Sequence, residues 1–158
     1  MRFRPSAACR DARRGVAAVE LAILLPFLCF LFCVAVDYAR VFYFALTVEN
    51  CARNGAYYAG DYPNNSYLYN DIYGYTDLND AITRDAGNLS PTPTWTKYYS
   101  SSPTGPFTLT SAPTTGTSYV QVTVNWTFNP ITSYPGIPTT VSLSRTCIME
   151  VAPALPSF

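Results

Sequence analysis

The chain has 158 residues, which is enough for one membrane anchor and one modest domain. Its ten basic and ten acidic residues balance, but five arginines precede residue 16, and the remainder lacks the basic surface of a nucleic-acid-binding protein. There is no histidine, which excludes histidine triads, general bases and metal ligands. No metal-type cysteine spacing occurs either, so we expect no metal site and no cofactor.

Residues 16–36 form the one segment that is long and apolar enough to cross a bilayer. Every residue in it is apolar except Glu20, and it contains one proline, Pro26. About 20 apolar residues span the hydrocarbon core, and membrane helices tolerate the kink that a proline introduces. The arginines of residues 1–15 keep the amino end in the cytoplasm, so we expect the rest to be exported. No small-residue cleavage site follows the segment, which favours a retained anchor over a secretory signal.

Glu20 is the one polar side chain in this segment. A carboxylate in hydrocarbon is costly, so it needs a partner or has to be neutral. Taken alone, Glu20 is as consistent with a side chain that reaches the membrane face or stays protonated as with one that pairs with a partner.

The helix is predicted to continue outside the membrane through residues 37–59. This stretch has no proline, and its apolar residues recur at intervals of three and four. Glu49 and Arg53 lie off the apolar stripe and are spaced to form an ion pair along the helix. One continuous helix through both segments would be about 65 Å long. We expect Gly60 and Pro63 to end it.

Residues 60–158 are predicted to form an exported α/β domain. Residues 60–75 are rich in tyrosine and asparagine, and we interpret them as a loop that covers the domain. The alternative is a contact surface, because tyrosine combines a large ring with a polar tip. Residues 76–87 are predicted to form a short helix that Thr76 caps and Gly87 ends.

Strands are predicted over residues 94–99, 107–110, 119–128 and 141–151. The strongest pattern lies in 119–128, where valine, tryptophan and phenylalanine alternate with polar residues. A proline-containing loop joins this strand to 141–151, which suggests an antiparallel pair. We expect the apolar face of the sheet to pack on the exported half of the long helix. The predicted fold class is therefore α+β, a long N-terminal helix packed against a small antiparallel β-sheet.

Five cysteines divide among three environments. Cys9 is cytoplasmic, and Cys29 and Cys33 lie within the membrane segment. Cys51 and Cys147 are the two that reach the oxidising side, so they are a candidate disulfide that would tie the long helix to the last strand. Two free thiols are the alternative.

The start of the apolar helix has three features in order: a short basic leader, a glycine, and an acid five residues after that glycine. This is the pattern of a type IV prepilin cleavage site. Four runs within residues 13–60 extend the pattern: Arg13-Arg14-Gly15-Val16-Ala17-Ala18-Val19-Glu20-Leu21-Ala22, Leu25-Pro26, Asp37-Tyr38-Ala39-Arg40-Val41-Phe42-Tyr43 and Ala52-Arg53-Asn54-Gly55-Ala56-Tyr57-Tyr58-Ala59. Through these runs, residues 13–60 resemble the TadE-like family of pseudopilins in bacterial tight-adherence (Flp pilus) systems.

The resemblance implies a pilin-like fold and cleavage after Gly15 by an inner-membrane prepilin peptidase. Residues 1–15 would be the leader, and Val16 would become the new amino terminus. In pilin-like assemblies the acid at the fifth position, here Glu20, meets the amino terminus of a neighbouring subunit. The implied location is the bacterial inner membrane, with the carboxyl-terminal domain outside the cytoplasm. The implied partners are the lipid bilayer, the peptidase and other pilin-like subunits.

Three functional hypotheses follow. The first is a minor pilin-like subunit of a tight-adherence pilus and secretion machine that acts through protein contacts, with no small-molecule substrate. The second is an uncleaved single-pass anchor that presents a β-rich binding or adhesion module through its tyrosine-rich loop. The third is an exported enzyme with a catalytic pair among Asp71, Asp77, Asp80 and Asp85, which is disfavoured because their helical positions explain these residues.

Overall fold

A computed structural model describes residues 8–68, 74–113, 116–131 and 139–153. The side chains of residues 8–14 and 62–68 are outside this description. The chain divides into two compact units, residues 1–40 and 41–158. The helix α1, Ala8–Leu68, contributes to both units. A long N-terminal helix and a three-stranded antiparallel sheet confirm the predicted α+β class.

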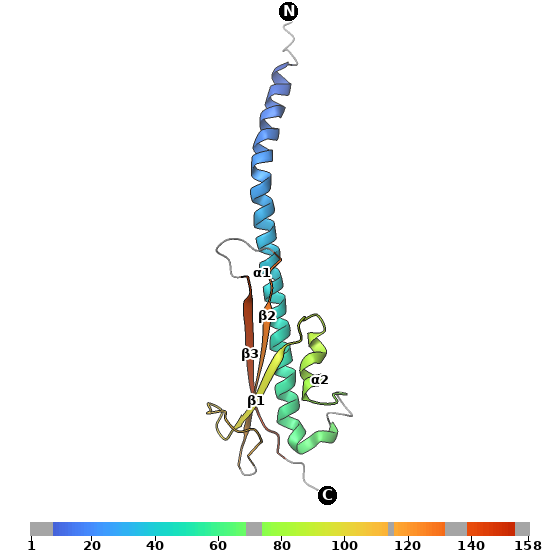
Figure 1. Cartoon of the computed structure of the whole chain (residues 1–158), viewed down its shortest axis with the longest axis vertical. Helices are drawn as coiled ribbons and strands as arrows, with labels where there is room; N and C mark the ends of the chain where they lie inside the picture. The colour runs from blue at the N-terminus through green and yellow to red at the C-terminus, as the bar shows by residue number, and fades with distance from the viewer. Residues whose placement is uncertain (1–7, 69–73, 114–115, 132–138, 154–158) are drawn as a thin grey trace, which may run out of the picture. The chain divides into compact units, whose positions relative to one another are not determined.

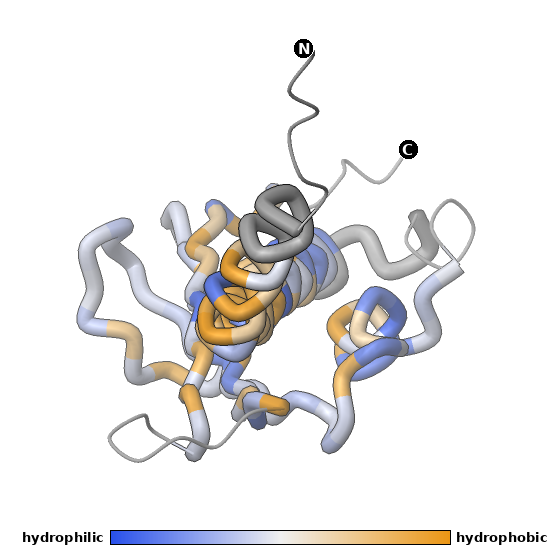
Figure 2. Tube along the Cα trace, turned by 90° about the horizontal axis from the view of Figure 1, so that it is seen from above, coloured by the Kyte–Doolittle hydropathy of each residue, from blue (hydrophilic) through white to orange (hydrophobic). Residues whose placement is uncertain are grey.

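The first unit is the amino-terminal part of α1. From Gly15 to Phe32 every side chain is exposed, although most of them are apolar. Figure 2 shows hydrophobic colour along these turns of the helix. Within the described residues, α1 is the one helix that is long and apolar enough to cross a membrane. An apolar helix surface that no protein covers is what a lipid-facing segment requires.

The second unit contains a three-stranded sheet in the order β1-β2-β3. The strands are β1 (Thr94–Ser100), β2 (Tyr119–Phe128) and β3 (Val141–Glu150), and both pairings are antiparallel. The central strand β2 alternates between one buried and one more exposed side chain along its length. Three of the four predicted strands are therefore present with nearly the predicted bounds.

The fourth predicted strand, residues 107–110, is not part of the sheet. Its one ladder contact is an isolated bridge in which Leu109 and Tyr99 exchange backbone hydrogen bonds. Pro106 precedes the segment and Pro113 follows it closely, and proline cannot donate a ladder hydrogen bond. The prediction of a full strand there is wrong.

The second-unit part of α1 packs on the sheet through a face of small side chains. The buried residues of this face recur at helical spacing: Val48, Cys51, Ala52, Gly55, Ala56 and Ala59. They form one core with the buried residues of β2, which are Val120, Val122, Val124, Trp126 and Phe128. Small residues let the helix backbone approach the sheet closely, and the branched and aromatic residues of β2 fill the remaining space. In Figure 1 the strands lie along this part of α1.

The helix runs antiparallel to β2. Near its carboxyl end, a side chain at Gly60 would meet Val120 at the start of β2. Near residue 44, the Phe44 ring lies 5.1 Å from the Trp126 ring and 5.8 Å from the Phe128 ring. Sixteen helical residues rise about 24 Å and eight strand residues about 26 Å, so the two contact sets stay in step along the interface.

The predicted end of the helix at Gly60 is wrong, because α1 continues to Leu68. Gly60 is buried, and an added Cβ would lie 3.3 Å from the carbonyl oxygen of Glu150. This glycine therefore permits a close approach to β3 and does not stop the helix. Of the residues interpreted as a loop, 60–68 are helical, and 69–73, which include two of its tyrosines, lie outside the described residues.

Pro63 explains an unusual hydrogen bond near the end of α1. In an α-helix the carbonyl of Ala59 would accept from the N–H of residue 63, which a proline lacks. The hydroxyl of Tyr99 on β1 donates to Ala59 O at 3.4 Å instead. The N–H of Ala152 donates to the next carbonyl, Gly60 O, at 2.9 Å. The helix is thus tied to β1 and to the segment that follows β3.

The short second helix is present, with a different cap. The helix α2 covers Leu78–Thr83, and a 3-10 turn, η2, covers Arg84–Ala86. Asp77 caps it, because its Oδ1 accepts from Asp80 N at 2.7 Å. Asp80 Oδ2 in turn accepts from Thr76 N at 3.1 Å, so the prediction of Thr76 as the cap was wrong by one residue.

We predict that Gly55→Ala lowers the free energy of unfolding by about 1–3 kcal/mol. An added Cβ would lie 2.6 Å from Ile82 Cγ1 and 3.1 Å from Val122 Cγ1, so α2 or the sheet has to move. Gly87→Ala is the matched control, because nothing lies within 4 Å of its Cβ position and its φ is −55°. Thermal or denaturant unfolding should show the control unchanged or raised by up to about 1 kcal/mol. Equal stability of the two variants would contradict this packing.

Candidate functional site: the head of α1 and its sheet-facing side

Gly15 lies inside α1, which begins at Ala8. An alanine Cβ built at Gly15 would have no atom within 4 Å other than those of its own helix and neighbours. Its φ is not in the left-handed region, where an L-residue would be strained. Neither packing nor backbone conformation therefore requires glycine here, although glycine weakens a helix by about 1 kcal/mol relative to alanine. Val16, the residue after the predicted cleavage site, is also exposed.

Glu20 lies one and a half turns further along the same exposed segment. Among the side chains that the structure describes, from residue 15 onward in α1, none makes a hydrogen bond or ion pair with it. Its neighbours along the helix are apolar and exposed. A carboxylate in such surroundings is destabilising unless another molecule provides a positive charge or a hydrogen-bond donor.

An ion pair follows the apolar segment. Arg40 Nη1 donates to Asp37 Oδ1 at 3.3 Å, and Asp37 is only 9% exposed. A buried carboxylate is tolerated when a cation compensates it. Sequence reasoning did not identify this pair, although the three-residue spacing on a helix was a usable signal.

The predicted pair of Glu49 and Arg53 is present. Arg53 Nη2 lies 3.4 Å from Glu49 Oε1, and both side chains are about half exposed. Such a pair on a solvated helix face contributes little to stability.

The carboxylates of the short helix have structural roles. Asp77 and Asp80 accept backbone hydrogen bonds at the start of α2, and Asp85 accepts from Asn54 Nδ2 at 2.8 Å. Asp71, the remaining member of the hypothetical catalytic set, lies outside the described residues. Among the side chains of residues 15–61, 74–113, 116–131 and 139–153, no group of three or more cysteine or acidic residues is arranged to hold a metal.

Cys51 and Cys147 lie in the same core. Cys51 is 0% exposed on α1, and the half-buried Cys147 is on β3, opposite Val122 of β2. Both are free cysteines in this structure. Burial raises the pKa of Cys147, the Arg53 charge lowers it, and the Glu49 charge raises it. Arg53 and Glu49 flank Cys51 on α1, so Cys147 faces the helical turns that hold Cys51. The disulfide stays a prediction.

The comparisons with known proteins place the family resemblance on α1. The model of the family described as TadE-like protein matches residues 15–56. No curated protein and no solved structure matches the chain. The chain therefore carries a TadE-like segment over about a quarter of its length, from the exposed Gly15 to the buried Ala56. A TadE-like segment on a helix able to span a membrane indicates a membrane protein associated with the tight-adherence pilus.

The Cys51 thiol predicts a pH dependence of stability in the reduced protein. Burial, and to a lesser extent the nearby Asp85 charge, raises its pKa from 9.0 to about 11. Because the folded pKa is the higher one, this stabilisation is complete below pH 9 and is lost as the pH rises through about 11. We expect the free energy of unfolding to fall by about 2–3 kcal/mol over this range.

Cys51→Ala should remove this part of the pH dependence, and Cys29→Ala in the membrane segment is the control that should retain it. A disulfide has no thiol to ionise. If Cys51 and Cys147 are bonded, the pH dependence that comes from Cys51 should appear only after reduction, and alkylation without reductant should leave both residues unmodified. A reduced protein whose unfolding profile is the same with and without Cys51 would contradict the burial described here.

Proposed function

We propose that the chain is a minor pilin-like subunit, a pseudopilin, of a tight-adherence pilus machine. It is anchored in the bacterial inner membrane by the amino-terminal part of α1, with its amino end in the cytoplasm and the sheet domain outside. It acts by helix packing and protein contacts, without a catalytic step. The observation that carries the proposal is the exposed Gly15 at the head of an uncovered apolar helix.

The three glycines of α1 whose surroundings are described differ in what requires them. At Gly55 and Gly60 an added Cβ would lie 3.3 Å or less from a neighbouring atom, so packing favours glycine at both positions. At Gly15 the same test finds open space. A peptidase that cuts the chain has to unwind the helix and fit the backbone into its active site. A glycine helps in both respects, because it lowers helix propensity and presents no side chain.

Cleavage after Gly15 would also create a positive charge that can pair with the Glu20 carboxylate. The new terminus at Val16 carries an amino group, and Glu20 becomes the fifth residue of the mature chain. Within one helix the two groups are one turn apart and exposed. Between two helices side by side in lipid, the amine of one subunit can pair with the carboxylate of the next. Such a pair sets the register of the helices, because each uncompensated charge in hydrocarbon is costly.

We predict that the mature protein begins at Val16 and that Gly15→Leu leaves it beginning at Met1. Because no described atom outside the local helix lies within 4 Å of a Cβ at residue 15, the substitution should not disturb the fold, and a loss of cleavage can be assigned to processing. Ala18→Leu is the matched control, since it adds the same side chain to the same exposed helix segment. Intact-mass spectrometry of the membrane fraction measures all three chains.

Ala18→Leu should be processed as the unmodified chain is. An unmodified chain that starts at Met1 in a cell with an active prepilin peptidase would contradict the proposal and favour the uncleaved anchor. Processing of Gly15→Leu at the wild-type rate would contradict the role given to the glycine.

A further inference from the structure

A lysine occupies the apolar, helix-facing side of the sheet. Residues directly opposite in an antiparallel pair point to the same face, so Lys97, which lies opposite Val122, shares the face of the buried valines of β2. Its neighbours on β1, Trp95 and Tyr99, also pack against the core. A charged side chain at such a position is unfavourable unless it has a partner or a function.

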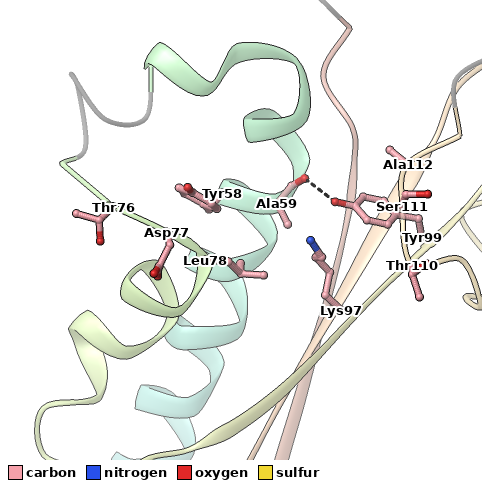
Figure 3. Close-up of a pocket in the computed structure, with 10 residues that line it drawn as sticks. All are labelled: Tyr58, Ala59, Thr76, Asp77, Leu78, Lys97, Tyr99, Thr110, Ser111 and Ala112. Carbon is pink, nitrogen blue, oxygen red and sulfur yellow. Dashed lines mark hydrogen bonds between the residues drawn. The ribbon is translucent and has the colours of Figure 1, made fainter.

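Lys97 opens onto a cavity of about 410 Å³ in the second unit. Its walls come from four separate segments: α1 with Tyr58, the start of α2 with Leu78, β1 with Lys97, and the segment of residues 110–112. Figure 3 shows the lysine amine directed into the space between α1 and the sheet. Binding sites for small organic groups start at about 300 Å³, so the cavity can hold one large side chain or a small organic acid.

The polar atoms of the cavity divide into those with and those without partners. The Tyr99 hydroxyl is used by Ala59 O, and Asp77 Oδ1 is used as the cap of α2. Among the residues that the structure describes, no carboxylate pairs with Lys97, whose charge lies 5.4 Å from the centre of the Tyr99 ring. The hydroxyls of Thr110 and Ser111 at the rim likewise have no hydrogen-bond partner within the described residues.

The walls define the chemistry of a ligand. The aromatic rings and Leu78 favour an apolar stem, and the ammonium and the rim hydroxyls favour an anionic, hydrogen-bond-accepting group. Burial lowers the pKa of Lys97, because the ammonium has lost water, and a bound carboxylate would replace that hydration. The titratable groups that face Lys97 are Tyr58, Tyr99 and Asp77. Asp77 is on the α2 side, which leaves the sheet side for the anion (Figure 3).

We propose that this cavity binds a carboxylate on a short apolar stem, with the ammonium of Lys97 as its counter-ion. The carboxylate belongs either to an acidic side chain flanked by apolar residues in another protein or to a free organic acid. The site is one of binding and needs no bond to form or break. It lies wholly in the second unit, so it does not depend on cleavage at Gly15.

The chain is well suited to a direct test, because Lys97 is its only lysine. Reductive methylation with ¹³C-formaldehyde keeps the positive charge and labels only Lys97 and the amino terminus. The full chain in nanodiscs is titrated with 4-phenylbutyrate and with its neutral amide, and NMR follows the dimethyl-lysine signal. We expect the carboxylate to shift this signal saturably and the amide to cause no comparable shift.

Affinities are measured by calorimetry against empty nanodiscs. Lys97→Gln should weaken carboxylate binding about tenfold or more, the amount expected for a lost charged hydrogen bond. Arg145→Gln is the matched control, because Arg145 is the other cation at a helix-facing position of the sheet, opposite Val124, but does not line the cavity. Arg145→Gln removes the same charge, and the affinity of this variant for the carboxylate should stay within about twofold of that of the unmodified chain.

Asp77→Asn tests the opposite end of the cavity. An asparagine keeps the capping oxygen of α2 but removes the charge, so it should tighten carboxylate binding. Thermal unfolding of each variant shows whether the fold is retained, and Lys97→Arg, which keeps the charge, should keep binding even if Lys97→Gln is destabilised.

Peptides distinguish the two sources of the carboxylate. An acetylated, amidated Phe-Glu-Phe peptide is compared with Phe-Gln-Phe and with 4-phenylbutyrate. Tighter binding of the glutamate peptide assigns the site to a protein partner, and tighter binding of the free acid assigns it to a small molecule. The proposal is overturned if the Lys97 signal does not move at tens of millimolar carboxylate, or if Lys97→Gln and Arg145→Gln bind equally.

Discussion

The contact between the small-residue face of α1 and the alternating side chains of β2 is the interaction on which the sheet domain, residues 41–158, depends. Alanines, a cysteine and Gly55 let the helix backbone lie close to the sheet, and valines with two aromatic residues at the far end fill the gap. The same close approach lets Ile82 of α2 contact the helix at Gly55. It also brings the carbonyls of Ala59 and Gly60 within reach of donors from the sheet and from the segment after it.

The two parts of α1 differ in how their apolar side chains are distributed, because only the second part packs on the sheet. Residues 16–32 of α1 are exposed, and all of them except Glu20 are apolar, which suits a lipid-facing helix. The part after residue 41 is apolar on one side only, and the side that carries Glu49 and Arg53 faces water. The change from an all-round to a one-sided apolar pattern occurs where the Asp37–Arg40 pair appears.

Much of this arrangement could be predicted from sequence patterns. The period of two in residues 119–128 and the three-four spacing in 37–59 each reflect burial on one face, so they identified both partners of the main contact. The family resemblance rested on the same helix, and the match to residues 15–56 confirms it there.

The errors occurred where tertiary contacts override a local rule. Gly60 ends a helix by the usual sequence rules, but here the close approach of β3 favours a residue without a side chain. Residues 107–110 have strand composition, yet only Leu109 bonds to β1. At the start of α2 both Thr76 and Asp77 are good caps, and only the three-dimensional path of the chain decides between them.

The cavity beside Lys97 could not have been found from the sequence, because its walls come from four separate segments. A partial signal was present, since the alternation of Trp95, Lys97 and Tyr99 places a lysine on the face that β1 buries.

Glu20, in contrast, could be identified from the sequence. Its isolation in an apolar segment was evident from the sequence, and the structure adds that no described side chain compensates it.

The functional account has one physical requirement, that the charge of Glu20 is compensated by another subunit within the membrane. Photo-cross-linking in the bacterial membrane tests it most directly, with the probe at Ala17 or at Ala22. Both are exposed alanines, but Ala17 lies one turn from Glu20 on its side of the helix and Ala22 lies on the opposite side.

The account predicts adducts with other pilin-like subunits from Ala17, few from Ala22, and loss of the Ala17 adducts when Glu20 is replaced by glutamine. Equal cross-linking from both positions, unaffected by Glu20→Gln, would contradict it.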